Sequence, residues 1–283
     1  NMRILPWFEY GLMIPASSAI AQSHPDWLTT TAAGETVAAP MQANSAFPQW
    51  LQNFQLEFVG GNLAWLNPAY PEVQAFLTDL IVEVVERYPV EGIQLDDHFG
   101  LPVAFGYDPY TVELYKADHG GLEPPADGNN PEWVAWRAEK ITQLMTKISQ
   151  AVKSVNPEAV VSVSPNPPAF AYSKYLQDWR RWVDLSLVDE VVVQVYRDDL
   201  AVLENDLYNS GFYDVREQVP TAIGLYTGPV TAAKSIDRLS DEIQLVQSAG
   251  YGGVAFFSWE TTLWALKGDS KKLVRSALVE RFS

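Results

Sequence analysis

Residues 92–98, GIQLDDH, carry the clearest signal of the fold. A β-strand would place its two apolar side chains, Ile93 and Leu95, on one face. Gln94 and Asp96 would then lie together on the opposite face. Strands of an open parallel sheet are usually apolar on both faces, because helices cover both. A strand with one polar face therefore favours a closed barrel, in which the polar side chains point toward the barrel axis.

The same alternation marks two further strand candidates, at residues 160–166 and 190–198. Each has valines in one phase and polar residues in the other, so we expect both polar faces to line the interior of the same barrel. The polar sets are Ser162, Ser164 and Asn166 in the first segment and Gln194, Tyr196 and Asp198 in the second.

Strands and helices alternate along the chain. Short apolar segments bounded by turn residues predict strands, and apolar residues at steps of three and four predict helices between them. Such an order implies right-handed parallel crossovers. The expected strands are Arg3 to Phe8, Gly92 to Asp96, Val160 to Ser164, Glu190 to Tyr196, Thr221 to Tyr226 and Gly253 to Trp259, and the expected helices are Pro71 to Arg87, Glu132 to Val155, Tyr172 to Leu187, Ile236 to Ser248 and Lys271 to Val279.

The predicted fold class is α/β, and the predicted architecture is a TIM-type βα-barrel. A closed barrel of this type has eight strands, whereas about six βα units are visible. Because the first strand already begins at Arg3, we expect the two absent units to lie before the first residue, or another chain to supply them. Residues 1–283 are interpreted as one partial barrel domain.

A long segment at about residues 10–66 has no extended helical pattern and is interpreted as an inserted βα loop. Long loops inside compact domains are usually functional, and in barrels they follow the C-terminal ends of strands, where active sites lie. An alternative is that Gln55 to Leu66 contributes strands of its own.

Composition excludes several classes of function. The chain has 19 basic and 35 acidic residues, a net charge of −16, which repels phosphate backbones and anionic lipid surfaces. Nucleic acid is therefore not an expected partner. The absence of cysteine excludes a disulfide scaffold, a thiolate zinc site and a cysteine nucleophile. No apolar run reaches the roughly 20 residues that span a bilayer, so no transmembrane segment is expected.

Three carboxyl groups at strand ends suit hydrolysis of a glycosidic bond, which commonly uses one acid and one nucleophile or base. Asp96 shares the inward face with Gln94, whereas Asp97 begins the next loop, so Asp96 is the better candidate nucleophile. Their like charges would also separate their pKa values. Glu9 lies between aromatic residues that would desolvate it, which favours a general acid. The structural alternatives are a helix cap or solvated loop for the pair and a backbone contact for Glu9.

Other acids and several aromatic residues are weaker candidates. Asp198 and Asp199 follow another strand and could equally cap the next helix, and Glu260 follows the last strand. Tryptophans in loop-like segments are candidate platforms for sugar rings, with packing as the alternative. They include Trp27, Trp65 and Trp259.

A catalytic metal is an alternative reading of Asp96, Asp97 and His98, which present carboxylate and imidazole ligands together. The sequence has three histidines and no HxH or HExxH pattern, so we expect neither a metal nor another cofactor. A serine nucleophile is not expected either, because the sequence has no GxSxG elbow.

Several motifs spread over nearly the whole chain resemble those of the bacterial glycosyl hydrolase-like family 10, a group of barrel glycosidases. Together they are specific, although none is specific alone. They are Ile4-Leu5-Pro6-Trp7-Phe8-Glu9-Tyr10-Gly11, His24-Pro25-Asp26-Trp27-Leu28, Trp65-Leu66-Asn67-Pro68, Gly92-Ile93-Gln94-Leu95-Asp96-Asp97, Ser164-Pro165-Asn166 and Gln194-Val195-Tyr196-Arg197.

This resemblance implies a (β/α)8 barrel, hydrolysis of O-glycosidic bonds and an association with bacterial envelope polysaccharide, hence a secreted or periplasmic location. It supports Glu9, Asp96 and Asp97 as site residues. Family members carry two further βα units before the strand that ends at Glu9. At His98 many relatives have Tyr, which would alter the subsite. The resemblance also places Asn166, Tyr196 and Arg197 along the cleft.

The sequence thus predicts a glycosidase for a polysaccharide or oligosaccharide, with Glu9 as acid and Asp96 or Asp97 as nucleophile or base. The alternatives are a non-catalytic carbohydrate-binding barrel and a metal-dependent hydrolase. Sugar, linkage, stereochemical outcome and oligomeric state are not specified by the sequence. The predicted substrate contacts are Trp7, Trp27, Trp65, His98, Asn166, Tyr196, Arg197, Asp198, Trp259 and Glu260.

Overall fold

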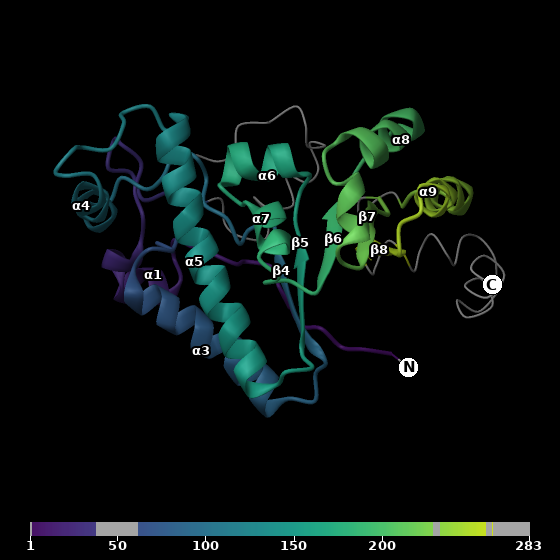
Figure 1. The fold of residues 1–283 in the computed structure, drawn as a ribbon, viewed down its shortest axis with the longest axis horizontal. Coiled ribbons are helices and arrows are strands. Elements are labelled where there is room, and N and C mark those ends of the chain that lie inside the picture. Colours follow the sequence, from purple (N-terminus) through teal and green to yellow (C-terminus); the bar gives the residue numbers. More distant parts are fainter. Residues whose placement is uncertain (1, 38–61, 229–232, 259–261, 263–283) are drawn as a thin grey trace. The chain divides into compact units, whose positions relative to one another are not determined.

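The computed structural model describes residues 2–37, 62–228, 233–258 and 262. The chain divides into two compact units (Figure 1). The first contains residues 1–163 and 168–189, and the second contains residues 164–167 and 190–283. Strands alternate with helices in both, which confirms the predicted α/β class.

The sheet of the first unit is ordered β1, β4, β5, with β1 at Trp7–Phe8, β4 at Gly92–Asp96 and β5 at Val160–Ser164. Residue Gly92 permits the close approach of β4 to β5, because a Cβ atom there would lie 2.1 Å from the carbonyl oxygen of Val160. Gln94 Nε2 donates to Ser162 Oγ over 2.9 Å. The predicted polar face of β4 therefore continues onto β5.

The three longest described helices of the first unit begin with proline in the first turn, where the missing N–H costs no hydrogen bond. They are α3 (Pro71–Arg87), α4 (Pro109–Asp118) and α5 (Pro131–Val155). Asp108 caps α4 and Asn130 caps α5, each accepting from backbone N–H groups. Helices α3 and α5 lie side by side (Figure 1). Their buried apolar residues include Val73, Leu77, Ile81, Ile141, Leu144 and Ile148.

The predicted helix from Tyr172 to Leu187 is wrong in one respect, because the structure has two helices there. These are α6 (Pro168–Tyr175) and α7 (Trp179–Asp184). Leu176 follows α6 with a φ of +55°, a left-handed conformation that ends the helix. Neither glycine nor proline marks this break in the sequence.

The predicted loop at residues 10–66 contains only short elements in its described part. They are β2 (Met13–Pro15), α1 (Ala19–Ser23), the 3-10 turn η1 (Pro25–Trp27) and β3 (Leu63–Trp65). Strands β2 and β3 pair antiparallel as a separate two-stranded sheet. The region Gln55 to Leu66 therefore does contribute a strand, although residues 38–61 lie outside the described residues.

The second unit has a parallel sheet ordered β6, β7, β8. Its described helices are separated by these strands. No helix in the described parts of the chain is long and apolar enough to cross a membrane. The predicted helix from Lys271 to Val279 lies outside the described residues. The elements are β6 (Glu190–Gln194), α8 (Leu200–Asn209), η2 (Tyr213–Glu217), β7 (Thr221–Tyr226), α9 (Ile236–Ser248) and β8 (Gly253–Phe257).

Candidate functional site

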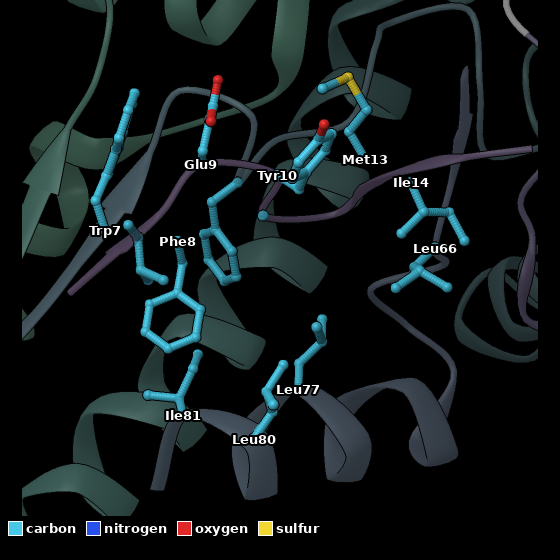
Figure 2. A pocket seen from close by; sticks show the side chains of 13 residues that line it. Trp7, Phe8, Glu9, Tyr10, Met13, Ile14, Leu66, Leu77, Leu80 and Ile81 are labelled. Atoms are coloured by element: carbon cyan, nitrogen blue, oxygen red, sulfur yellow. The ribbon is translucent and has the colours of Figure 1, made fainter. Parts of the chain in front are cut away.

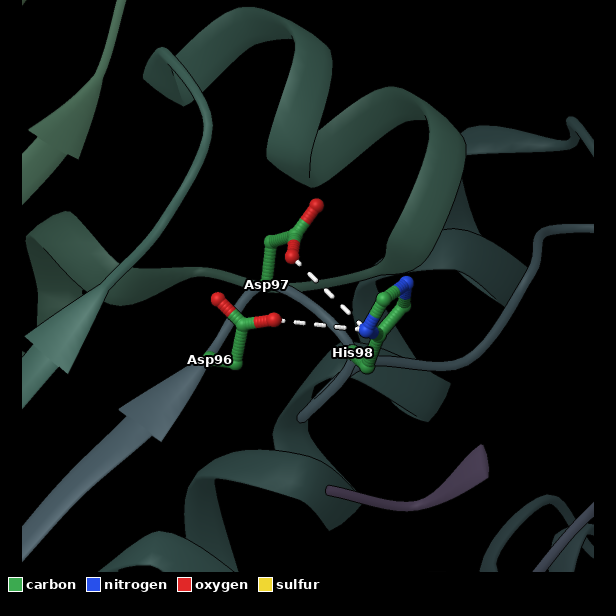
Figure 3. Close-up of side chains that lie close together, drawn as sticks. All are labelled: Asp96, Asp97 and His98. Atoms are coloured by element: carbon green, nitrogen blue, oxygen red, sulfur yellow. Dashed lines mark ion pairs between the residues drawn. The ribbon is translucent and has the colours of Figure 1, made fainter. Parts of the chain in front are cut away.

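The turn after β4 brings two carboxyl groups and an imidazole together (Figure 3). Asp96 ends the strand and is 3% exposed, whereas Asp97 and His98 are partly exposed. The His98 Nδ1 atom lies 3.3 Å from Asp96 Oδ2 and 3.9 Å from Asp97 Oδ1. Strand phase thus predicted the placement of this pair: Asp96 belongs to the strand and Asp97 to the turn.

A second contact of His98 shows which ring nitrogen carries a proton. Nδ1 lies 2.9 Å from the backbone carbonyl oxygen of Glu9. Because a carbonyl oxygen only accepts hydrogen bonds, Nδ1 must carry the proton in this contact. The imidazole therefore joins the end of β1 to the end of β4.

The neighbours of Asp96 and His98 change the pKa of these two groups. Burial first, and then the charge of Asp97, raises the pKa of Asp96 well above its ordinary value, while His98 opposes this change. Burial works against the charged imidazole of His98, but the charge of Asp97 and the hydrogen bond and charge of Asp96 raise its pKa to about 10. A protonated His98 thus offsets part of the repulsion between the two acids.

Glu9 lies beside this cluster because of the register between β1 and β4. Trp7 is opposite Gln94 and Phe8 is opposite Leu95, in parallel. Continuing that register by one residue places Glu9 opposite Asp96, on the same face of the sheet. Figure 2 agrees: Phe8 points toward Ile81 of α3, and Glu9 points to the other side of the strand.

A cavity of about 390 Å³ lies on the α3 side of β1 (Figure 2). Its lining is mainly apolar, and Glu9 is the one acidic residue among its described lining residues. Such a lining suits apolar groups rather than a polyhydroxylated sugar. The residues include Phe8, Met13, Leu66, Leu77, Leu80 and Phe99.

The backbone around the turn is held from two sides. Gly11, with a φ of +53°, lies so close that a Cβ atom would be 2.4 Å from the Phe99 nitrogen. On the other side, the Gln177 side chain donates to the carbonyl oxygens of Asp96 and Phe99, both over 3.1 Å. Sequence reasoning missed Gln177, because the helical pattern predicted for residues 172–187 gave no signal of a turn at this position.

The predicted tryptophan platforms differ in exposure. Trp7 is 41% exposed, whereas Trp65 is 3% exposed and packs on Phe105 with ring centroids 5.4 Å apart. Trp27 stacks on His24 at 4.0 Å. These contacts favour packing over sugar contact for Trp65 and leave Trp7 as the more accessible ring.

The other predicted contacts belong to the second unit. Arg197 pairs with Asp206 over 2.7 Å, Tyr196 stacks on Phe257 at 5.9 Å, and Asn166 is 6% exposed. Asp198 is exposed, and its neighbour Asp199 caps α8. Trp259 and Glu260 lie outside the described residues. Roles for these residues in substrate binding stay predictions.

The same turn contains the residues on which the alternative of a catalytic metal depends. One ligand atom each of Asp96, Asp97 and His98 lies within 4.8 Å of the others. The imidazole presents Nδ1 to both carboxylates, and that atom carries a proton toward Glu9. A protonated Nδ1 has no lone pair for a metal, so the contacts of that nitrogen fit an ion pair better than a ligand set.

Comparison with known proteins gives a consistent picture. A family model described as Glycosyl hydrolase-like 10 matches residues 1–244. The glycosyl hydrolase DigH of Escherichia coli O6:H1 is 35% identical over 146 residues, which cover 46% of this chain and 31% of DigH. The glycosyl hydrolase YngK of Bacillus subtilis strain 168 is 24% identical over 165 residues, 53% of this chain and 30% of YngK. The matched part spans less than a third of either relative.

Two solved structures show the same fold. A catalytic mutant of Gan42B, a GH42 β-galactosidase from G. stearothermophilus, matches 91% of this chain and 41% of its own with a TM-score of 0.62 and 11% identity. The PgaB glycoside hydrolase domain from Bordetella bronchiseptica matches 70% of this chain and 60% of its own, with a TM-score of 0.56 and 12% identity. At such identities the likeness shows the fold alone, which confirms the predicted TIM-type α/β architecture.

Proposed function

The chain belongs to the glycosyl hydrolase-like 10 family, and from that premise we propose that it hydrolyses O-glycosidic bonds of a polysaccharide by paired-carboxylate catalysis. The observation that carries the proposal is the register of β1 and β4. It supports an arrangement in which Glu9 lies beside Asp96 and Asp97 at the same ends of two adjacent parallel strands. The C-terminal ends of the strands are where TIM-barrel enzymes place their reacting groups.

In this mechanism, Glu9 is the general acid that protonates the leaving glycosidic oxygen. Asp97 is the carboxylate that attacks the anomeric carbon or activates water, because its side chain is 15% exposed and that of Asp96 is 3% exposed. Asp96 holds His98 through the 3.3 Å contact. The positive charge of the imidazolium in turn stabilises the negative charge of Asp97, which lies beside a second acid.

For the substrate, we propose an oligosaccharide or polysaccharide of the bacterial envelope. Relatives from Escherichia coli and Bacillus subtilis support a bacterial setting. Trp7 supports sugar contact, because strand alternation puts it on the same face as Glu9 and it is 41% exposed. A net charge of −16 favours a glycan that is not strongly anionic.

A screen of envelope and storage polysaccharides tests the proposal, with reducing ends counted and products identified by mass. Wild-type protein should release new reducing ends from at least one polymer. Glu9→Gln and Asp97→Asn should each lower turnover by roughly 10²–10⁴-fold, as expected when an acid or base is removed. Binding of a glycan without release of reducing ends would instead favour the non-catalytic barrel, and loss of activity with a chelator would favour the metal-dependent hydrolase.

A further inference from the structure

Gln177 contacts both ends of the turn that presents the candidate catalytic groups. The Phe99 N–H donates to the Asp96 carbonyl over 3.0 Å, which closes a four-residue turn. Asp97 and His98 are the two central residues of that turn. The amide of Gln177 bonds the carbonyl of the first residue and the carbonyl of the last, both over 3.1 Å.

The chain around Gln177 is shaped to reach this turn. Leu176 is fully buried and has a φ of +55°, a conformation that residues other than glycine keep only when their surroundings enforce it. On one side of it, the Tyr175 carbonyl accepts from Leu101 N–H over 2.7 Å. On the other side, Gln177 is 2% exposed and points its amide at Asp96. The left-handed residue thus lets both neighbours bond the segment from Asp96 to Leu101.

Close packing leaves the turn little room to move. A Cβ atom on Gly100 would lie 2.8 Å from the Tyr175 carbonyl oxygen. On the opposite side, a Cβ atom on Gly11 would lie 2.5 Å from the carbonyl carbon of His98. Burial, followed by the charge of Asp97, raises the pKa of Tyr175, so its phenol stays neutral beside that carboxylate.

We propose that Gln177 is a positioning residue, which fixes the turn so that Asp97 and His98 are held in their working orientation. It is not a catalytic residue, since its contacts are with backbone carbonyls. The inference rests on the proposed function where it concerns turnover. Its geometric part, that Gln177 sets the conformation of the turn, stands separately.

The test replaces Gln177 with Met, which has similar length and no donor. Gln74→Met is the matched control, because Gln74 in the same unit also donates to a carbonyl, that of Pro68, over 2.8 Å. In the full chain, Gln177→Met should lower kcat on the polymer found in the screen by about 10-fold or more, as for other groups that orient a reacting residue, with KM changed less than about 2-fold. Gln74→Met should leave kcat unchanged.

A second readout does not need activity. The ring Nδ1 proton of His98 bonded to Glu9 gives a distinct NMR resonance, and Gln177→Met should shift or broaden it, whereas Gln74→Met should not. If the wild type hydrolyses no polymer, the proposed function fails. The His98 resonance then still tests whether Gln177 positions the turn. A wild-type signal together with wild-type kcat in Gln177→Met would overturn the inference.

Loss of folding in the variant is covered by two further measurements. Gln177→Leu is a second variant that lacks a donor and buries no charge, so the same changes are expected. If neither variant folds, amide exchange of the wild type decides. A clamped turn should give the Phe99 N–H protection similar to that of Leu95 in β4, and fast exchange at Phe99 alone would contradict the role of Gln177.

Discussion

Two aspartates of the first unit are equally buried but have opposite surroundings. Asp96 is 3% exposed and Asp108 is 4% exposed. The Asp108 carboxylate accepts hydrogen bonds from Thr29, Asn67 and Thr111, at 2.8 to 2.9 Å. Asp96 instead faces a second acid, Asp97, and a histidine.

The difference separates a carboxylate that is held by neutral donors from one that lies among other titratable groups. The donors around Asp108 are neutral and come from three separate segments of chain, and Asp108 itself caps α4. The network therefore joins these segments without placing a second titratable group there. Around Asp96 the neighbours carry charge themselves, so the pKa values of Asp96 and His98 depend on each other and on the charge of Asp97. Perturbed groups of this kind cluster at functional sites.

The largest expected effect is that of Asp97→Asn, at the proposed site beside Asp96. Turnover should fall by about 10³-fold, roughly 4 kcal/mol of transition-state stabilisation, because the amide neither attacks nor accepts a proton. Urea unfolding should change by less than about 1 kcal/mol, since Asp97 is partly exposed. A variant that keeps turnover within tenfold of the wild type would remove Asp97 from the mechanism.

The second effect is on stability and concerns Asp108→Ala. Removing this carboxylate leaves the buried donors of Thr29 and Asn67 without an acceptor and takes away the cap of α4. We expect the free energy of unfolding to fall by about 3 kcal/mol, measured by urea titration. Asp79→Ala, at an exposed position on α3, is the control and should cost less than about 0.5 kcal/mol. Equal losses in the two variants would contradict the structural role of Asp108.

The third effect is a pH dependence from His98. Its pKa is about 10 in the folded chain against an ordinary value of 6.5, so the folded state binds this proton more tightly. The resulting stabilisation is fully present below about pH 6.5 and is lost as the pH rises through about 10, and it amounts to a few kcal/mol. The measurement is unfolding free energy from pH 6 to 10.5 for wild type and His98→Gln. Parallel curves for the two proteins would argue against a charged His98.

The surroundings of Asp96 could be predicted from the sequence better than those of Asp108. The alternation in residues 92–98 predicted that Asp96 ends a strand and that Asp97 begins the turn, because strand phase is a local property. The network of Asp108 was not predicted, since Thr29 and Asn67 lie 79 and 41 residues from it and carry no local signal. The burial of Trp65, a predicted sugar platform, against Phe105 also depends on a contact distant in the sequence, so no local signal in the sequence indicates it.

The break at Leu176 shows the same limit. A left-handed leucine has no sequence signature, because side-chain preference there opposes the conformation that the fold imposes. The contacts of Tyr175 and Gln177 with the turn after β4 depend on this break. Sequence periodicity continued the helix across it, and so hid the residue that we infer positions the site.

The smallest expected effect is that of Thr29→Val, which tests whether the Asp108 network is purely structural. The Thr29 hydroxyl donates to Asp108 Oδ2 over 2.8 Å and accepts from Gly106 N–H over 2.9 Å. Valine keeps the shape and removes both bonds, so unfolding should cost about 1 kcal/mol less. Thr29→Ser, which keeps the hydroxyl, should recover most of that loss. Turnover should stay within twofold of the wild type in both, because Asp97 and Glu9 are untouched. A fall in turnover near that of Asp97→Asn would mean that the two buried aspartates share one reaction centre, and the distinction between neutral and titratable surroundings would not hold.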